Sequence, residues 1–262
     1  MIPIQYALRR RMMMAAMASI DISALSITYT GAYTDYGMVT MSDGARYRLL
    51  AFTSSGTLSI EQPVNCEVCV VGGGANGAKA TSSGGSGGAG AYLKNQSVSA
   101  YNGGPVVVGA RQGVSSIADV SVNAVSGRDG GTGAGGQAAG TGDGISKYPF
   151  EDTGYSLWAG KPHCAGGGQG TFQDNKGGFT GGDGGTNGGN GYPRGSYSSS
   201  PFGGAGGRYG GGAGGSQGRG KDATYYGSGA GGGARYISNG TSDYNGGSGY
   251  QGIVYIRIPA IQ

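Results

Sequence analysis

The residues that could do chemistry are few and stand apart. The only histidine, His163, is followed directly by Cys164. On an extended chain neighbouring side chains point to opposite sides, and no second base of this type is available, so a nucleophile–base dyad is not expected. The adjacent carboxylates Glu151 and Asp152 favour a solvated turn over a pair of glycosidase acids. The chain is therefore not expected to be an enzyme.

Cys66 and Cys69 have the Cys-X-X-Cys spacing found in zinc and redox sites. No second pair of this spacing completes a zinc set. Within a strand, positions three apart face opposite sides, which disfavours chelation or a disulfide between the two. The chain has 3 cysteines in total, an odd number. We expect buried free thiols, consistent with assembly in a reducing cytoplasm, and no metal or other cofactor.

A glycine run at residues 72–77 follows a strand-like segment, as in dinucleotide-binding loops. Such a loop opens a helix and is followed by an acid about 20 residues later. Here more glycine follows at residues 84–90, which a helix tolerates poorly. The net charge of +4, with 12% charged residues, comes without a dense basic stripe beyond the N-terminus. Nucleic acid is therefore not an expected partner.

Glycine dominates the composition, with 63 of 262 residues. A chain this rich in glycine is disordered unless its own backbone does the packing. Disordered glycine-rich tracts contain few aromatics, whereas this chain has 18 Tyr, 5 Phe and 1 Trp. With 8 prolines and no strict Gly-X-Y repeat, it is not collagen. The composition therefore favours an ordered architecture held by main-chain hydrogen bonds.

The glycine runs recur as Gly-Gly-X, with X mostly small or polar. A period of three matches the three residues per turn of an extended left-handed helix. With glycine on two of its three edges, such a helix can approach its neighbours until the backbones touch. Each N–H can then donate to the C=O of a neighbouring helix. Net hydrogen-bond energies of roughly 0.5–1.5 kcal/mol must together offset an entropy cost of about 1–2 kcal/mol per residue.

The chain divides into three predicted parts. Residues 1–25 are an attachment segment, residues 26–71 a small antiparallel β-sheet region, and residues 72–262 a glycine-rich domain. The predicted strands of the second part are residues 26–29, 37–41, 47–52, 57–60 and 66–71, with turns at 43–44 and 55–56. Further strands are predicted at residues 105–108, 118–122 and 249–258. Pairing between the N- and C-terminal strands would close the domain.

The attachment segment has a basic triplet, Arg9-Arg10-Arg11, followed by a methionine-rich run. As a secretory signal its apolar run is short, and it is too short for a membrane helix, so membrane insertion is not expected. The methionines suit a short helix that adapts to a partner groove. A disordered terminus is the alternative.

An ordered series of motifs resembles a known family. It comprises residues 67–74, 85–92 and 106–110, repeated Gly-Gly-Ala-Gly-Gly, and residues 246–257. This series resembles the glycine-rich domain of bacteriophage tail fibres and tail-tip adhesins, and it covers about residues 67–258. The resemblance implies a mainly β and irregular fold in which packed polyglycine II helices form the scaffold. Residues 1–12 are also similar to the start of minor tail proteins of phages that infect Gram-positive gut bacteria.

In the family, loops at the distal end of the scaffold contact the host surface. Non-glycine insertions mark these loops, and the largest covers residues 145–164. Rigid aromatics beside small polar residues suit a binding surface. The predicted receptor-binding residues are Tyr148, Phe150, Tyr155, Trp158, Tyr192, Tyr197, Phe202, Tyr225 and Tyr226. The alternative for each aromatic is that it packs against the glycine scaffold and supplies its missing apolar burial.

Three function classes remain open. The resemblance favours a receptor-binding protein at the distal end of a virion tail or tail fibre, made in the host cytoplasm. Its expected partners are a bacterial wall polysaccharide or surface protein, a tail protein bound through residues 1–25, and further copies in a homotrimer. A purely structural or ice-binding glycine protein should lack long aromatic insertions. A depolymerase should carry a convergent acid or base cluster.

Overall fold

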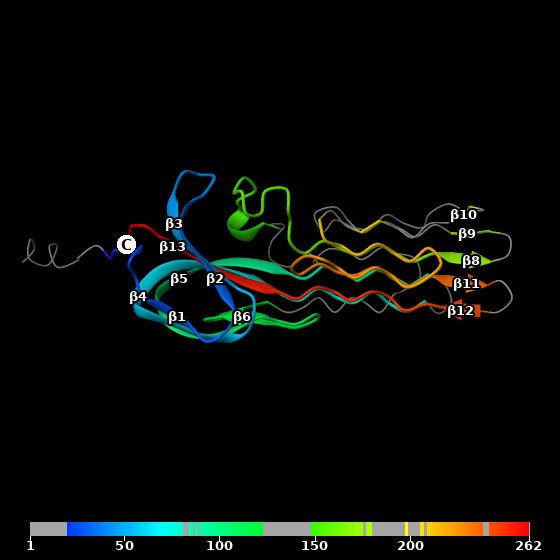
Figure 1. Cartoon of the computed structure of the whole chain (residues 1–262), viewed down its shortest axis with the longest axis horizontal. Helices are drawn as coiled ribbons and strands as arrows, with labels where there is room; N and C mark the ends of the chain where they lie inside the picture. Colours follow the sequence, from blue (N-terminus) through cyan, green and yellow to red (C-terminus); the bar gives the residue numbers. More distant parts are fainter. Residues whose placement is uncertain are drawn as a thin grey trace, which may run out of the picture.

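The computed structural model describes residues 20–80, 84–85, 87–88, 90–122, 148–174, 177–179, 197–198, 205–206, 209–237 and 241–261. The described body is elongated (Figure 1). A curved eight-stranded sheet lies at one end and a small five-stranded sheet at the other. Glycine-rich segments run side by side between the two sheets.

The fold is mainly β, as predicted, and its pairs are antiparallel except for one in the small sheet. The large sheet contains β1 (Ile27–Tyr29), β2 (Tyr33–Thr40), β3 (Arg46–Phe52), β4 (Gly56–Val71), β5 (Leu93–Val107), β6 (Ser115–Ile117), β7 (Val120–Val122) and β13 (Ile253–Pro259). The small sheet contains β8 (Phe172–Asp174), β9 (Gly177–Phe179), β10 (Tyr197–Ser198), β11 (Arg235–Ile237) and β12 (Thr241–Asp243). A single 3-10 turn, η1 (Pro149–Glu151), is the only helix in the described residues.

The large sheet has the strand order β2-β3-β13-β4-β5-β6-β7, with β1 pairing separately with β4. The two runs predicted at residues 57–60 and 66–71 form one long strand, β4, whose register with β5 shifts between Ser59 and Cys66. The last strand, β13, lies between β3 and β4. This one sheet therefore contains strands from both sides of the domain boundary that was predicted between residues 71 and 72.

Alternation along β4 builds two hydrophobic clusters, one on each face of the sheet. Cys66, Val68 and Val70 belong to the first cluster, and Cys69 and Val71 to the second. The two cysteines thus face opposite sides, as the three-residue spacing predicted. All three cysteines are free and buried, also as predicted.

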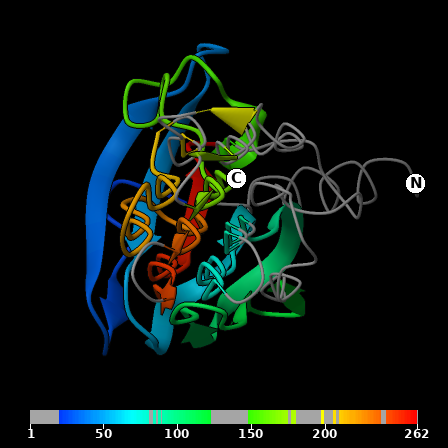
Figure 2. The ribbon, with the colours of Figure 1, turned by 90° about the vertical axis from the view of Figure 1, so that its right-hand side faces the viewer.

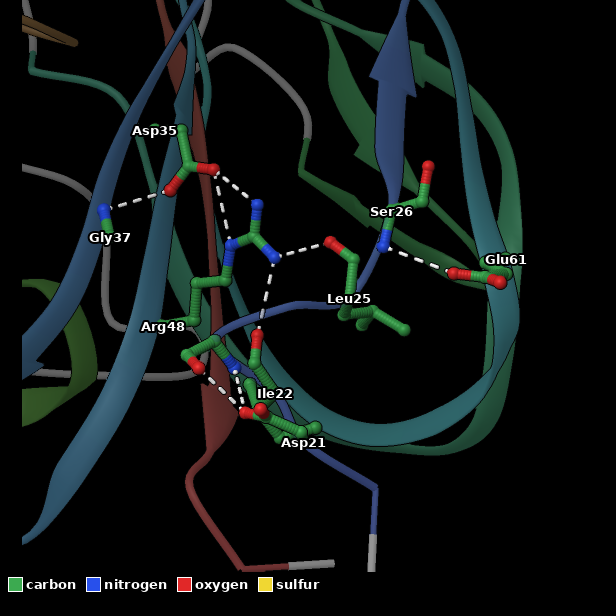
Figure 3. Close-up of polar contacts among 9 residues, drawn as sticks. Asp21, Ile22, Leu25, Ser26, Asp35, Gly37, Arg48 and Glu61 are labelled. Carbon is green, nitrogen blue, oxygen red and sulfur yellow. Dashed lines mark hydrogen bonds and ion pairs between the residues drawn. The ribbon is translucent and has the colours of Figure 1, made fainter.

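The end of the predicted attachment segment belongs to the sheet. Ile22 and Leu25 are buried in the first cluster. Arg48 of β3 donates to the carbonyl oxygens of Ile22 at 3.2 Å and Leu25 at 2.5 Å, and forms an ion pair with Asp35 at 2.6 Å (Figure 3). These contacts fix residues 20–26 to the sheet. A separate attachment segment can therefore extend only to about residue 19, whose own structure lies outside the described residues.

Seven glycine-rich segments form what we call the glycine lattice. They are residues 72–80, 84–91 without 86 and 89, 164–171, 210–215, 218–224, 227–235 and 244–252. Backbone hydrogen bonds join them with a step of three residues. For example, the N–H groups of Gly74, Gly77 and Ala80 donate in turn to the carbonyls of Tyr250, Gly247 and Tyr244. Figure 2, which looks along the lattice, shows such segments as narrow coils lying side by side.

The segment 227–235 lies at the centre of the lattice and bonds to the other six. Its N–H groups donate to three neighbours in rotation. The pairs are Gly229 to Ala165, Ala230 to Ala75, Gly231 to Lys221, Gly232 to Gly168, Gly233 to Ala78 and Ala234 to Gly218. Its carbonyls accept from the other three neighbours with the same step. Residues 228, 229 and 230 accept from Tyr250, Gly212 and Gly88, respectively. Residues 231, 232 and 233 accept from Gly247, Gly215 and Gly85.

Around this centre, segments that accept its hydrogen bonds alternate with segments that donate to it. Adjacent members of the ring also bond to one another, as Gly168 does to Gly212 and Lys221 to Ala213. The backbone groups of residues 229–233 are therefore paired by main chain alone, and glycine is what permits the approach. A Cβ built at Gly77, Gly167 or Gly231 would overlap a carbonyl of the facing segment. The same holds for Gly206, whose Cβ would overlap the carbonyl of Gly211.

Candidate functional site

The described part of the long aromatic insertion, residues 148–164, lies beside the large sheet (Figure 1). It was expected in the loops at the distal end of the scaffold, and the described part packs against the large sheet. Asp152 fixes its path, because its carboxylate accepts hydrogen bonds from Ser42 N and from the backbone N–H groups of Gly154 and Tyr155, each at 3.0 Å. The carboxylate also accepts from Ser42 Oγ. Asp152 is buried. It therefore joins the insertion to Ser42 and is not the solvated turn residue that was expected.

Two of the predicted receptor-binding residues belong to the core. Trp158 has no exposed surface, and Phe150 is buried beside it. Both belong to the second cluster, which also contains Met41, Leu49 and Tyr255. The indole N–H of Trp158 donates to the carbonyl of Asp152, which satisfies its one polar group. For these two residues the predicted receptor contact is wrong, and the packing alternative holds.

A cluster of six tyrosines lies where the large sheet meets the glycine lattice. We call it the tyrosine patch, and it comprises Tyr209, Tyr225, Tyr226 and Tyr250, which ring contacts join, and Tyr155 and Tyr36, which electrostatic interactions link to one another and, through Tyr36, to Tyr225 and Tyr226. The exposed fractions of Tyr209, Tyr36 and Tyr250 are 43%, 41% and 36%, which places their rings at the surface. The other three are partly buried. Exposed aromatic side chains gathered in this way can form a binding surface.

Ring contacts join four members of the patch in a row. Tyr209 meets Tyr225 edge to face with centroids 4.9 Å apart. Tyr225 contacts Tyr226 at 5.4 Å, and Tyr226 meets Tyr250 at 5.6 Å. The Nζ atom of Lys161 lies 5.8 Å from the Tyr209 ring centroid, so a cation borders one end of the row.

The patch rests on a buried layer that holds its rings in place. His163 stacks against Tyr226 with centroids 6.1 Å apart and an angle of 17° between the ring planes, and its ring lies 4.9 Å from that of Tyr225. The His163 Nε2 atom lies 3.1 Å from the Tyr255 hydroxyl. Burial lowers the pKa of His163 to about 3, so this imidazole is neutral at physiological pH. Tyr155 packs edge to face on Trp158 at 4.8 Å.

The patch presents neutral hydroxyl groups. Burial raises the pKa of Tyr155, Tyr225 and Tyr226, and neighbouring tyrosines add to the effect. Each phenol therefore stays protonated and can both donate and accept a hydrogen bond. Flat apolar faces with hydroxyl groups at their rims can bind a ligand of mixed polarity by stacking and hydrogen bonding.

The other predicted residues are not part of this patch. Tyr148 is partly buried against the second hydrophobic cluster. Tyr197 lies in β10 of the small sheet, where only its backbone is described. Tyr192 and Phe202 lie outside the described residues. Three of the nine predicted residues, Tyr155, Tyr225 and Tyr226, thus come together in the structure.

Sequence reasoning missed three members of the patch, Tyr36, Tyr209 and Tyr250, as well as Lys161. Tyr36 stands at the register shift between β2 and β3, far along the chain from the others. A signal existed for Tyr209 and Tyr250, because each is a lone aromatic beside a glycine run.

No group of three His, Cys, Asp or Glu side chains among the described residues is arranged to hold a metal ion. In the same part of the chain, no helix is long and apolar enough to cross a membrane.

Comparison with protein-family models, with curated proteins and with solved structures found no match to this chain.

Proposed function

We propose that this protein is a receptor-binding protein of a bacteriophage tail, an adhesin that holds a bacterial surface molecule without cleaving it. The main observation behind the proposal is the tyrosine patch, which lies where the large sheet meets the glycine lattice. Exposed aromatic rings fixed in place give a large contact area at a low cost in conformational entropy. The sequence resemblance to tail-tip adhesins supports the same assignment.

In this proposal the glycine segments are polyglycine II helices, and the pairing of β13 with β3 and β4 closes the domain. The three-residue step of the hydrogen bonds supports the helix assignment, since a threefold helix directs successive groups to neighbours about 120° apart. A lattice in which each backbone group is paired resists bending. It would therefore give the patch a rigid support without a large apolar core.

Attachment to the virion would occur at the large-sheet end. Ile22 and Leu25 pack into the sheet, so whatever precedes them is connected there. A tail protein bound through the residues before 20 would leave the lattice and the tyrosine patch free for the host. Several copies per virion, as in a homotrimer, would multiply individually weak contacts.

The experiment that tests this function measures binding of the fluorescently labelled protein to bacterial cells and its competition with phage adsorption. We expect the unmodified protein to bind host cells, and Tyr36→Ala/Tyr209→Ala/Tyr250→Ala to lose most of that binding. These rings are exposed, so folding should be preserved, and a thermal melt checks this.

Tyr244→Ala is the matched control, because this tyrosine is also exposed, at 37%, but lies on the lattice away from the patch. We expect it to bind normally. Loss of binding in Tyr244→Ala with normal binding in the triple variant would move the site to the far end of the lattice. A protein that binds no bacterial surface and does not compete with a phage would contradict the function itself.

A further inference from the structure

The glycine lattice also brings two arginine side chains together at Ser248. Arg111 Nη1 lies 2.8 Å from Ser248 Oγ, and Arg219 Nη2 lies 3.4 Å from the same oxygen. Arg111 comes from the loop between β5 and β6, and Arg219 from the lattice segment 218–224. Two guanidinium groups from separate parts of the chain therefore meet at one hydroxyl.

The lattice holds this arrangement in a defined geometry. Arg219 donates through Nε to the carbonyl of Gly246 at 3.2 Å and through Nη2 to Asp222 at 2.8 Å. Asp222 also accepts from the backbone N–H of Ser248 at 2.6 Å. The loop of Arg111 is fixed to the lattice because Gln112 N donates to the carbonyl of Gly74 at 3.1 Å.

The charges on this face do not balance. Within the described residues, Asp222 is the one carboxylate that contacts the pair, and it is held by Arg219 and Ser248. Among the described residues, Arg111 forms no ion pair. Lys79 on segment 72–80 and Lys221, on the same segment as Arg219, are also exposed. Two like charges close together repel, and an anion between them would relieve the repulsion.

We propose that Arg111 and Arg219 form an anion site that binds the phosphate groups of an extended polyanion. Guanidinium groups match phosphate oxygens with paired hydrogen bonds, and such charge-assisted bonds are the stronger ones. The side chain of Arg219 is 57% exposed, so the site is open along the lattice rather than enclosed. An open site suits a chain that passes over it. This inference does not depend on the tyrosine patch.

The test measures binding of fluorescently labelled poly(glycerol phosphate) by anisotropy, with inorganic phosphate and neutral dextran as further probes. We expect the polymer to bind and to bind more weakly as salt is raised, and dextran to have no effect. Arg111→Gln/Arg219→Gln should weaken polymer binding by about tenfold or more, because both charge-assisted contacts are lost.

Arg46→Gln/Lys94→Gln is the matched control, since it removes two positive charges from the large sheet. We expect it to retain most of the affinity for the polymer, and thermal melts should show all variants folded. Equal weakening in the two double variants would mean that net charge alone attracts the polymer, which overturns the site. Absence of binding by both probes would overturn it too. Binding of inorganic phosphate but not of the polymer would contradict the inference that the ligand is an extended polyanion.

Discussion

The α-carbon of Gly231 faces the carbonyl oxygen of Ala213 so closely that a Cβ added at Gly231 would overlap it. Gly231 is in the central segment, whose neighbours surround it, so no side can move away freely. Gly231→Ala should therefore destabilise the protein by at least about 3 kcal/mol or prevent folding. Denaturant unfolding followed by circular dichroism measures this.

Gly218→Ala is the control for this prediction. A Cβ built at Gly218 meets nothing within 4 Å, and the residue is not in the left-handed region of backbone space. The free energy of unfolding of Gly218→Ala should stay within about 1 kcal/mol of that of the parent protein. Equal stability of the two variants would show that the segments are not packed at the spacing described.

The buried His163 predicts a loss of stability in acid. Burial lowers its pKa to about 3, against about 6.5 in the unfolded chain. Below about pH 6.5 the unfolded state therefore binds a proton that the folded state does not. The free energy of unfolding should fall by up to about 1.4 kcal/mol per pH unit from this group as the pH drops toward 3. His163→Gln, which cannot titrate, should show a smaller decrease between pH 7 and pH 4.5, and an identical decrease would contradict the assignment.

Asp152 is predicted to hold the insertion against the sheet. Burial raises the pKa of its carboxyl, but the hydrogen bonds from Ser42, Gly154 and Tyr155 outweigh this and keep the pKa below its ordinary value. Asp152→Ala leaves several donors without an acceptor and should cost about 1–3 kcal/mol in unfolding free energy. The fluorescence of the single Trp158, which packs beside Asp152, should shift toward that of solvated indole. Unchanged emission and stability would refute the role of this carboxylate.

Arg48 is predicted to tether residues 20–26 to the sheet (Figure 3). Arg48→Met removes both carbonyl contacts and the ion pair with Asp35 but keeps an apolar stem. Proteases should then cleave within residues 20–26 several times faster than in the parent protein. Arg46→Met, on the same strand but exposed, should leave the cleavage rate unchanged. Equal rates in all three proteins would mean that apolar burial of Ile22 and Leu25 suffices.

Part of this fold could be predicted because it depends on local pattern. Alternation in residues 66–71 identified the strand and assigned Cys66 and Cys69 to opposite faces. The Gly-Gly-X period indicated a backbone with a three-residue repeat. The neighbours of each segment could not be predicted, because runs such as 210–215 and 229–234 both consist of glycine and alanine alone. Only the three-dimensional arrangement distinguishes the central segment from those around it.

The site was less predictable, since exposure depends on long-range packing. Trp158 and Tyr155 lie in the same insertion, yet the tryptophan is buried and the tyrosine only half so. The strands that bury Trp158, β3 and β13, lie about a hundred residues before and after it in the sequence. Tyr36 joins the patch from an edge strand, and no spacing in the sequence links it to Tyr225.

Hydrogen exchange of individual amides in the segment 227–235 tests the central claim most directly. If paired main chain forms a rigid lattice, the amides of residues 229–234 should be among the slowest to exchange, with opening free energies close to that of global unfolding. Their protection should match that of β4 and β13. Exchange of these amides at the rates of an unstructured peptide, while the large sheet stays protected, would contradict the lattice and the binding surface it supports.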